Sequence, residues 1–166
     1  METVIKNKAF TLIEMLVVVL IIAILAAIAL PRYMTAVDQS KLSQAIMSSR
    51  ALAEAETRYQ LANGKWAADM RALDISLDGG TINASGNWIT YPWGFCYTNC
   101  GNDNSCGGCA LSKGDLLTIV LYSPWSKPLK YCYAGTGKER SEHLCQIATQ
   151  KDTPQSTGSQ YSVYAF

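Results

Sequence analysis

Hydrophobic residues are distributed very unevenly along this 166-residue chain. Residues 10–30 form an almost unbroken apolar run that contains a single charged residue, Glu14. At about 1.5 Å per residue, a helix over this run spans roughly 31 Å, which is close to the thickness of a bilayer hydrocarbon core. The run therefore predicts a transmembrane helix, and Lys6 and Lys8 in front of it are expected on the cytoplasmic side.

The residues that follow predict an amphipathic continuation of the same helix. Residues 32–62 contain no Gly or Pro, and apolar side chains recur at helical spacing while most charged ones lie elsewhere. Pro31 stands at the junction, where it removes one helical hydrogen bond and is expected to introduce a kink. Asn63 and Gly64 supply a C-terminal stop. One face of the second half is then available to pack on a globular region.

Beyond residue 64 the chain becomes polar and Gly-rich, with short runs typical of β-strands. These runs are 87–91, 94–97, 116–122 and 129–134. The run 94–97 is expected to extend the run 87–91 beyond Pro92. The continuous apolar run 116–122 suits a central strand. A small antiparallel sheet covered by the amphipathic half-helix gives an α+β fold. The polar tail, 151–166, is compatible with an ordered strand or with a fraying end.

All six cysteines lie between Cys96 and Cys145. An even count in a polar region behind a membrane segment favours disulfides formed in an oxidising compartment. Four of the cysteines form a tight cluster, for which three pairings are possible and the spacing selects none. They are Cys96, Cys100, Cys106 and Cys109. A zinc site is the alternative, because four thiolates in a Gly-rich loop can bind zinc tetrahedrally.

Other candidate chemistry is sparse. His143 is the only histidine and is predicted to lie in a charged loop, and an even cysteine count argues against a free catalytic thiol. The carboxylates Asp69, Asp74 and Asp78 could bind calcium, although solvated or turn-capping roles suit a loop better. The balance of 14 basic against 13 acidic residues gives no reason to expect nucleic acid as a direct partner. We therefore expect no catalytic residue, cofactor, metal or small-molecule substrate.

The residues from Lys8 to Glu14, which read KAFTLIE, resemble the signature of type IV prepilins when taken with the apolar run and Pro31. In that family a membrane-embedded prepilin peptidase cuts just before the Phe and methylates the new amino group. The resemblance places the cut between Ala9 and Phe10 and makes Phe10 the N-methylated first residue. Ala9 departs from the Gly that is usual before the cut, and it is small enough for processing.

The resemblance also implies how the chain is organised. The expected parts are a leader at 1–9, a transmembrane and filament-core helix at 10–30, its amphipathic continuation at 31–63, and a β-sheet head with Cys-rich loops at 64–166. Cys132 and Cys145 are expected to form the C-terminal disulfide loop common in pilins, which leaves the other four cysteines to make two bonds among themselves.

Glu14 acquires a role from the same resemblance. A carboxylate inside an apolar helix costs about 2.5–3.5 kcal/mol on insertion scales, so it requires a partner. In a filament of packed helices, Glu14 is expected to pair with the Phe10 ammonium group of a neighbouring subunit. This pair would set the axial register between subunits.

The function implied is that of a structural subunit of a type IV pilus. The precursor sits in the inner membrane, and inner-membrane assembly machinery polymerises the cleaved subunit into a helical homo-oligomer on the cell surface, for adhesion, twitching motility or DNA uptake. One alternative is a pseudopilin of a periplasmic type II secretion piston, since residues 91–94 resemble a Pro-Trp-Gly segment of some major pseudopilins, although these usually lack disulfides. The other is a membrane-tethered zinc-binding module, which would leave Glu14 without a role.

Overall fold

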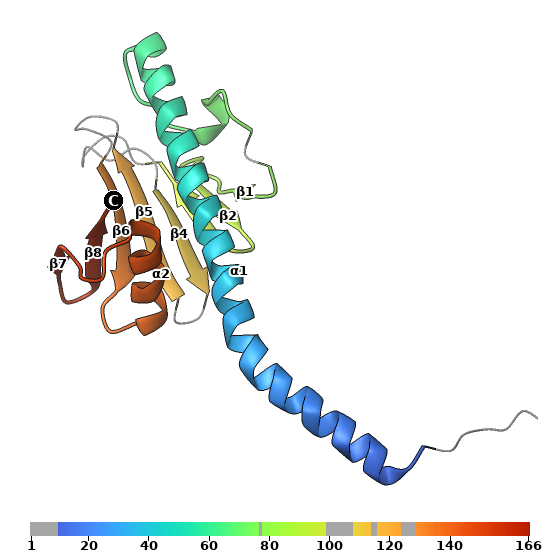
Figure 1. Ribbon diagram of the computed structural model, residues 1–166. Helices are drawn as coiled ribbons and strands as arrows, with labels where there is room; N and C mark the ends of the chain where they lie inside the picture. The colour runs from blue at the N-terminus through green and yellow to red at the C-terminus, as the bar shows by residue number, and fades with distance from the viewer. Residues whose placement is uncertain (1–9, 77, 99–107, 114–115, 124–128) are drawn as a thin grey trace, which may run out of the picture. The chain divides into compact units, whose positions relative to one another are not determined.

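The structure is a computed structural model that describes residues 10–76, 78–98, 108–113, 116–123 and 129–166 (Figure 1). The chain divides into two units, Met1–Val37 and Asp38–Phe166, each of which is described by itself. The predicted leader, 1–9, lies outside the described residues, as do Cys100 and Cys106.

The long N-terminal helix is α1 (Leu12–Asn63). In the first unit its large apolar side chains are exposed, and it is the helix of the described chain that is long and apolar enough to cross a membrane. The helix continues through Pro31, and the Thr35 hydroxyl donates to the Pro31 carbonyl at 3.1 Å. The predicted stop is confirmed, because Gly64 adopts a positive φ of 70° directly after Asn63.

The second unit is built on an eight-stranded antiparallel sheet. The strands are β1 (Thr81–Ile82), β2 (Trp88–Tyr91), β3 (Gly94–Tyr97), β4 (Gly108–Lys113), β5 (Leu116–Ser123), β6 (Leu129–Gly135), β7 (Ser156–Thr157) and β8 (Tyr161–Ala165). Their order across the sheet is β1-β2-β3-β4-β5-β6-β8-β7, which confirms the α+β class and the central position expected for residues 116–122.

One face of this sheet forms the core with the second half of α1. The strand register aligns Ile89 with Cys96 and Cys96 with Cys109, and all three side chains are fully buried. They pack in one cluster with Leu42 and Leu52 of α1. The apolar residues of α1 that recur at helical spacing therefore cover the sheet, as the amphipathic pattern predicts.

A second helix, α2 (Glu139–Thr149), replaces the loop that was predicted between Cys132 and Cys145. It packs over β6 on the face of the sheet that α1 also covers (Figure 1). The Arg140 guanidinium donates to the buried Asp38 carboxylate of α1 at 2.6 Å, which ties the two helices together. The prediction that His143 lies in a loop was wrong, because His143 is exposed on α2.

The predicted extension of residues 87–91 beyond Pro92 is also corrected. Pro92 and Trp93 form a two-residue turn, so that β2 and β3 pair as an antiparallel hairpin. Gly94 lies so close to β4 that any Cβ there would collide with the Ala110 carbonyl oxygen, which explains the glycine at the start of β3. The tail forms β7 and β8, and Tyr164 of β8 is buried against Cys132.

Glu56 is an ionisable residue buried within the second unit. Its Oε2 accepts a hydrogen bond from the Ala67 N–H at 3.1 Å, whereas Oε1 has no hydrogen-bond partner among the described residues. Burial raises the pKa of the Glu56 carboxyl above its ordinary 4.5, and the Ala67 hydrogen bond opposes this shift more weakly. Folding therefore favours the protonated form.

Replacing Glu56 with glutamine is expected to stabilise the protein at pH 7 and to have a smaller effect at pH 4. Because the pKa of Glu56 is higher in the folded than in the unfolded state, its protonation stabilises the fold. This stabilisation is fully present below the unfolded pKa of 4.5 and is lost as the pH rises through the folded-state pKa. Glutamine keeps an acceptor for Ala67 but cannot ionise. Urea unfolding of both full chains in detergent micelles measures this difference, and an equal change in unfolding free energy at the two pH values would contradict it.

Candidate functional site

The start of α1 carries the residues that the sequence singles out for cleavage and assembly. The Glu14 Oε2 accepts hydrogen bonds from the Thr11 N–H at 2.9 Å and from the Thr11 hydroxyl at 2.7 Å. In return, the Glu14 N–H donates to the Thr11 hydroxyl oxygen at 3.3 Å. This reciprocal arrangement is a capping box, which satisfies backbone N–H groups that the first helical turn leaves without partners.

The capping role of Glu14 was missed in the sequence, although Thr-x-x-Glu before an apolar run is its signature. Sequence reasoning explained the carboxylate only through a neighbouring subunit. Both observed hydrogen bonds use Oε2, so Oε1 remains available for a second donor. Within one subunit, then, Glu14 has a local structural role that is compatible with an additional partner.

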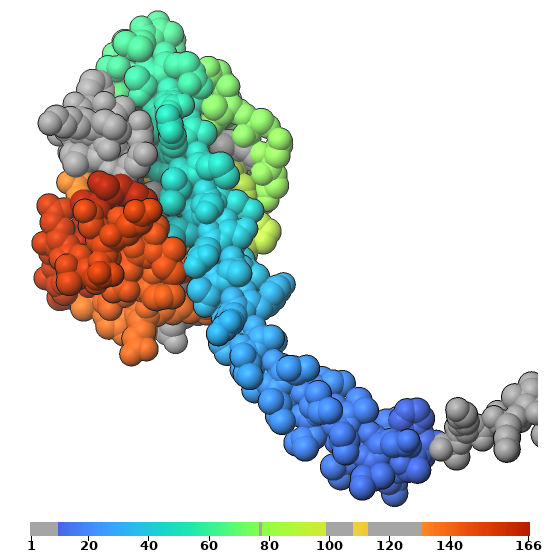
Figure 2. All heavy atoms as spheres, in the orientation of Figure 1, coloured from blue at the N-terminus to red at the C-terminus, as the bar shows by residue number. Residues whose placement is uncertain are grey.

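The surface of α1 in the first unit is almost entirely apolar. Phe10 is 69% exposed and Leu12 is 91% exposed, and the large hydrophobic side chains from Ile13 to Leu30 are exposed as well. This stretch of the chain is the blue segment in Figure 2. Exposed apolar surface on this scale marks contact with lipid or with another protein. Apolar residues lie on all sides of this helix. Its whole surface must therefore be shielded from water, either by a bilayer or by several neighbouring helices.

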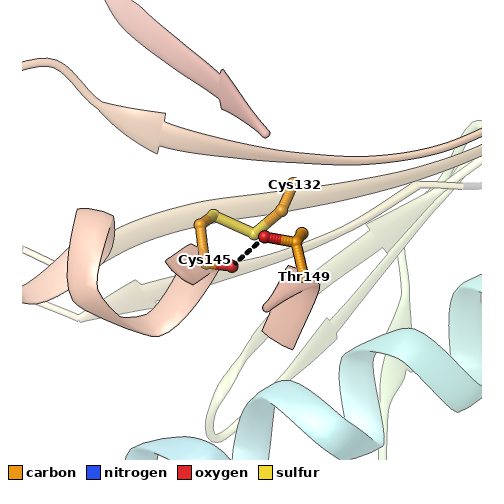
Figure 3. The surroundings of a disulfide bond; sticks show 3 residues. All are labelled: Cys132, Cys145 and Thr149. Atoms are coloured by element: carbon orange, nitrogen blue, oxygen red, sulfur yellow. Dashed lines mark hydrogen bonds between the residues drawn. A yellow bond between two sulfur atoms is a disulfide. The ribbon is translucent and has the colours of Figure 1, made fainter. Parts of the chain in front are cut away.

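Among the described residues of the second unit, four cysteines form two disulfides. One joins Cys132 of β6 to Cys145 of α2, the residues for which the resemblance suggests a C-terminal disulfide loop (Figure 3). The Thr149 hydroxyl donates to the Cys145 carbonyl at 2.7 Å. The other disulfide joins Cys96 to Cys109, which face each other across β3 and β4. This second pairing could not be selected from the spacing of the cysteines.

The alternative metal sites find no support in the geometry. Cys96 and Cys109 are joined by a disulfide, so their sulfurs are not thiolate ligands in this structure. Asp69 caps a short helical turn through the Arg71 N–H, which lowers the pKa of the Asp69 carboxyl. Asp74 accepts two hydrogen bonds from the Arg58 guanidinium, which lower the Asp74 pKa. In the described part of the chain, no three His, Cys, Asp or Glu side chains are grouped to hold a metal ion.

The predicted site residues therefore fall into two groups. Phe10, Glu14 and Pro31 belong to the first unit, and the described cysteines belong to the second. The first group combines an apolar helix with a capped, charged N-terminal turn.

Comparisons with known proteins place a family motif within the first unit. The family model described as the prokaryotic N-terminal methylation motif matches residues 5–30. The type IV major pilin protein PilE1 of Neisseria gonorrhoeae is 44% identical over 60 residues, which are 36% of this chain and 36% of that protein. A fimbrial protein of Neisseria meningitidis serogroup A is 40% identical over 70 residues, which are 42% of this chain and 41% of that protein.

A third relative matches over more of the chain. The type II secretion system core protein G of Pseudomonas aeruginosa is 29% identical over 132 residues, which cover 79% of this chain and 77% of that protein. The matches to the first two relatives span only 36% and 41% of their lengths. No solved structure matches the chain.

Proposed function

We propose that this chain is a pilin, a structural and non-catalytic subunit of a type IV pilus, and its similarity to the N-terminal methylation motif and to type IV pilins supports this. One observation carries the proposal: from Leu12 onward, the methylation motif matched at residues 5–30 lies on helix α1, whose large apolar side chains are exposed there. An apolar helix that is retained after processing can move from the bilayer into a bundle of neighbouring helices, because both provide an apolar environment. The same segment then serves first as a membrane anchor and later as a filament core.

The position of the motif supports a processing step. We infer that residues 1–9 are a leader, that a prepilin peptidase cleaves between Ala9 and Phe10, and that the new amino group is methylated. Residues 10–30 then act as the membrane and core helix, 31–63 as its amphipathic continuation and 64–166 as the head. Inner-membrane assembly machinery would extract the processed subunit and add it to a surface filament for adhesion, motility or DNA uptake.

Assembly requires a partner for the charge on Glu14. We propose that its carboxylate pairs with the methylated Phe10 ammonium group of a neighbouring subunit, using the oxygen that the capping box does not occupy. In a core of packed apolar helices an unpaired charge is strongly disfavoured, so the pair would favour one axial register over others. Pro31 would allow the helix to adjust at the junction during packing.

A second candidate is a pseudopilin of a type II secretion system, which the long match to core protein G favours. Such a subunit would share the processing steps and form a periplasmic piston. The disulfides found in the described part of the head favour the pilus, since major pseudopilins usually lack them.

Mass spectrometry of unreduced protein sheared from the surface of the native cell tests the proposal. We expect a chain that begins at Phe10, carries one extra methyl group and retains its disulfides. Recovery of this species only from the periplasm would favour the pseudopilin. A chain that begins at Met1 and stays in the membrane would refute both candidates.

A further inference from the structure

A groove of about 410 Å³ lies beside the second half of α1, within the second unit. One wall is formed by Gln44, Ser48 and Ala51, which follow one another at intervals of four and three residues and therefore share one face of the helix. Ser48 and Ala51 have short side chains, so this wall leaves room opposite the β2–β3 hairpin. The volume falls within the range of about 300–1,000 Å³ that is typical of small-ligand sites.

Two stacked aromatic rings form the opposite side of the groove. Tyr91 and Trp93 flank Pro92 at the hairpin turn, and their ring centroids lie 4.9 Å apart with an angle of 7° between the ring planes. Both side chains are half-buried and pack against the core cluster. The rings are therefore held in place before any ligand arrives. Their π faces are negative, which attracts the weakly positive C–H groups of an aliphatic ring.

The polar groups of the groove define what else a ligand must carry. The Gln44 amide and the hydroxyls of Ser48 and Ser76 each provide both a hydrogen-bond donor and an acceptor. Asp78 adds an acceptor, and its carboxylate lies close enough to Tyr91 to add to the effect of burial in raising the pKa of the Tyr91 hydroxyl. A ligand that complements these side chains has several groups that can each donate and accept hydrogen bonds.

The charge of the groove excludes other classes of ligand. Among the described residues that line it, Asp78 carries the single charge and no side chain is basic. A phosphate or a nucleic-acid backbone would therefore meet one negative charge and no compensating positive one. An organic ammonium ion would be attracted by the rings and by Asp78, but it has no use for the donors of Gln44, Ser48 and Ser76.

We propose that this groove is a saccharide-binding site, in which one face of a sugar ring lies against the Tyr91–Trp93 pair. The ring hydroxyls exchange hydrogen bonds with Gln44, Ser48 and Ser76, and Asp78 accepts one more. The site gives the exposed head of the subunit a direct way to recognise glycans. It depends only on the second unit, so it stands whether the chain builds a pilus or a pseudopilus.

Saturation-transfer NMR with the full chain tests the proposal. The protein is held in micelles of a polyoxyethylene detergent, which contains no sugar, and the probes are the methyl glycosides of glucose, galactose, mannose and N-acetylglucosamine. We expect transfer to the C–H protons of at least one glycoside. Ala51→Phe fills the groove from the exposed face of α1 and should weaken this binding by about tenfold or more, which corresponds to about 1.4 kcal/mol.

Met47→Phe is the matched control, because Met47 is 65% exposed on α1 and does not line the groove. It adds the same aromatic ring and should leave glycoside binding unchanged. Asp78→Asn keeps the fold and the size of the side chain while removing the charge, and it should retain most of the binding. The absence of transfer to every glycoside would overturn the proposal, as would equal transfer in Ala51→Phe and Met47→Phe. Displacement of the glycoside by tetramethylammonium at equal concentration would assign the rings to a cation instead.

Discussion

Replacing Glu14 with valine is expected to reduce the yield of assembled filament by about 100-fold or more, while the precursor still inserts into the membrane. On the pairing proposed above, the change would leave the Phe10 ammonium group of the neighbouring subunit buried without a partner. Removing one member of a buried ion pair costs about 3–5 kcal/mol, and each 1.4 kcal/mol is a factor of ten in an equilibrium. Insertion itself becomes easier, because valine carries no charge into the bilayer.

The capping box complicates this test, since Glu14→Val also removes the hydrogen bonds to Thr11. Glu14→Gln separates the two roles, because glutamine can complete a capping box but carries no charge. We expect Glu14→Gln to be nearly as defective in assembly as Glu14→Val. Thr11→Val is the complementary variant, which weakens the cap by about 1 kcal/mol and keeps the carboxylate.

Filament sheared from cells and quantified against total membrane-bound protein measures the outcome. Thr11→Val should assemble within about tenfold of the parent chain, since it loses a cap and no charge pair. If Thr11→Val is as defective as Glu14→Val, or if Glu14→Gln assembles normally, Glu14 acts through the helix N-terminus and the proposed register role fails.

The parts of the fold that were predicted correctly are those with a strong local signal. The apolar run at 10–30 and the stop at Asn63 can be recognised from neighbouring residues alone. The run 116–122 is continuous and apolar, and it forms the central strand β5. In each case the pattern is long enough to outweigh the competing possibilities.

The elements that were missed depend on tertiary context. The first turn of α2 contains Glu139, Arg140 and Glu142, so it resembles a charged loop, and the helix forms where Leu144 and Cys145 can be buried against the sheet. Strand β4 consists largely of small residues and contains none that is β-branched. It becomes a strand because β3 and β5 both pair with it. β1 and β7 have two residues each, too few to show any periodicity.

In the candidate site, too, contiguous motifs could be predicted from the sequence and contacts between distant residues could not. The motif around Glu14 is contiguous, and the sequence therefore located it. The partner of Cys96 could not be chosen, because the spacing allows three pairings among four cysteines. The structure selects Cys109 through strand register, which places the two residues opposite each other.

Replacing both Cys132 and Cys145 with alanine is expected to lower the free energy of unfolding by about 2–4 kcal/mol and to detach α2 before the rest of the head unfolds. The disulfide links α2 to β6, and the remaining anchors of α2 are a few buried side chains such as Leu144 and the ion pair of Arg140 with Asp38. Without the covalent link, α2 should open locally. Hydrogen exchange of the full chain in detergent micelles should then show faster exchange of the α2 amides than of the β6 amides.

The double variant Cys96→Ala and Cys109→Ala is a matched control, because both disulfides have a sequence separation of 13. Models based on loop entropy therefore assign them the same effect on the unfolded chain. They differ in the folded state, since Cys96 and Cys109 lie in strands that a ladder of backbone hydrogen bonds already joins. The control should lose a similar amount of global stability but show no selective exchange in α2. If α2 remains protected without Cys145, its packing alone holds it, and the disulfide acts only by restricting the unfolded chain.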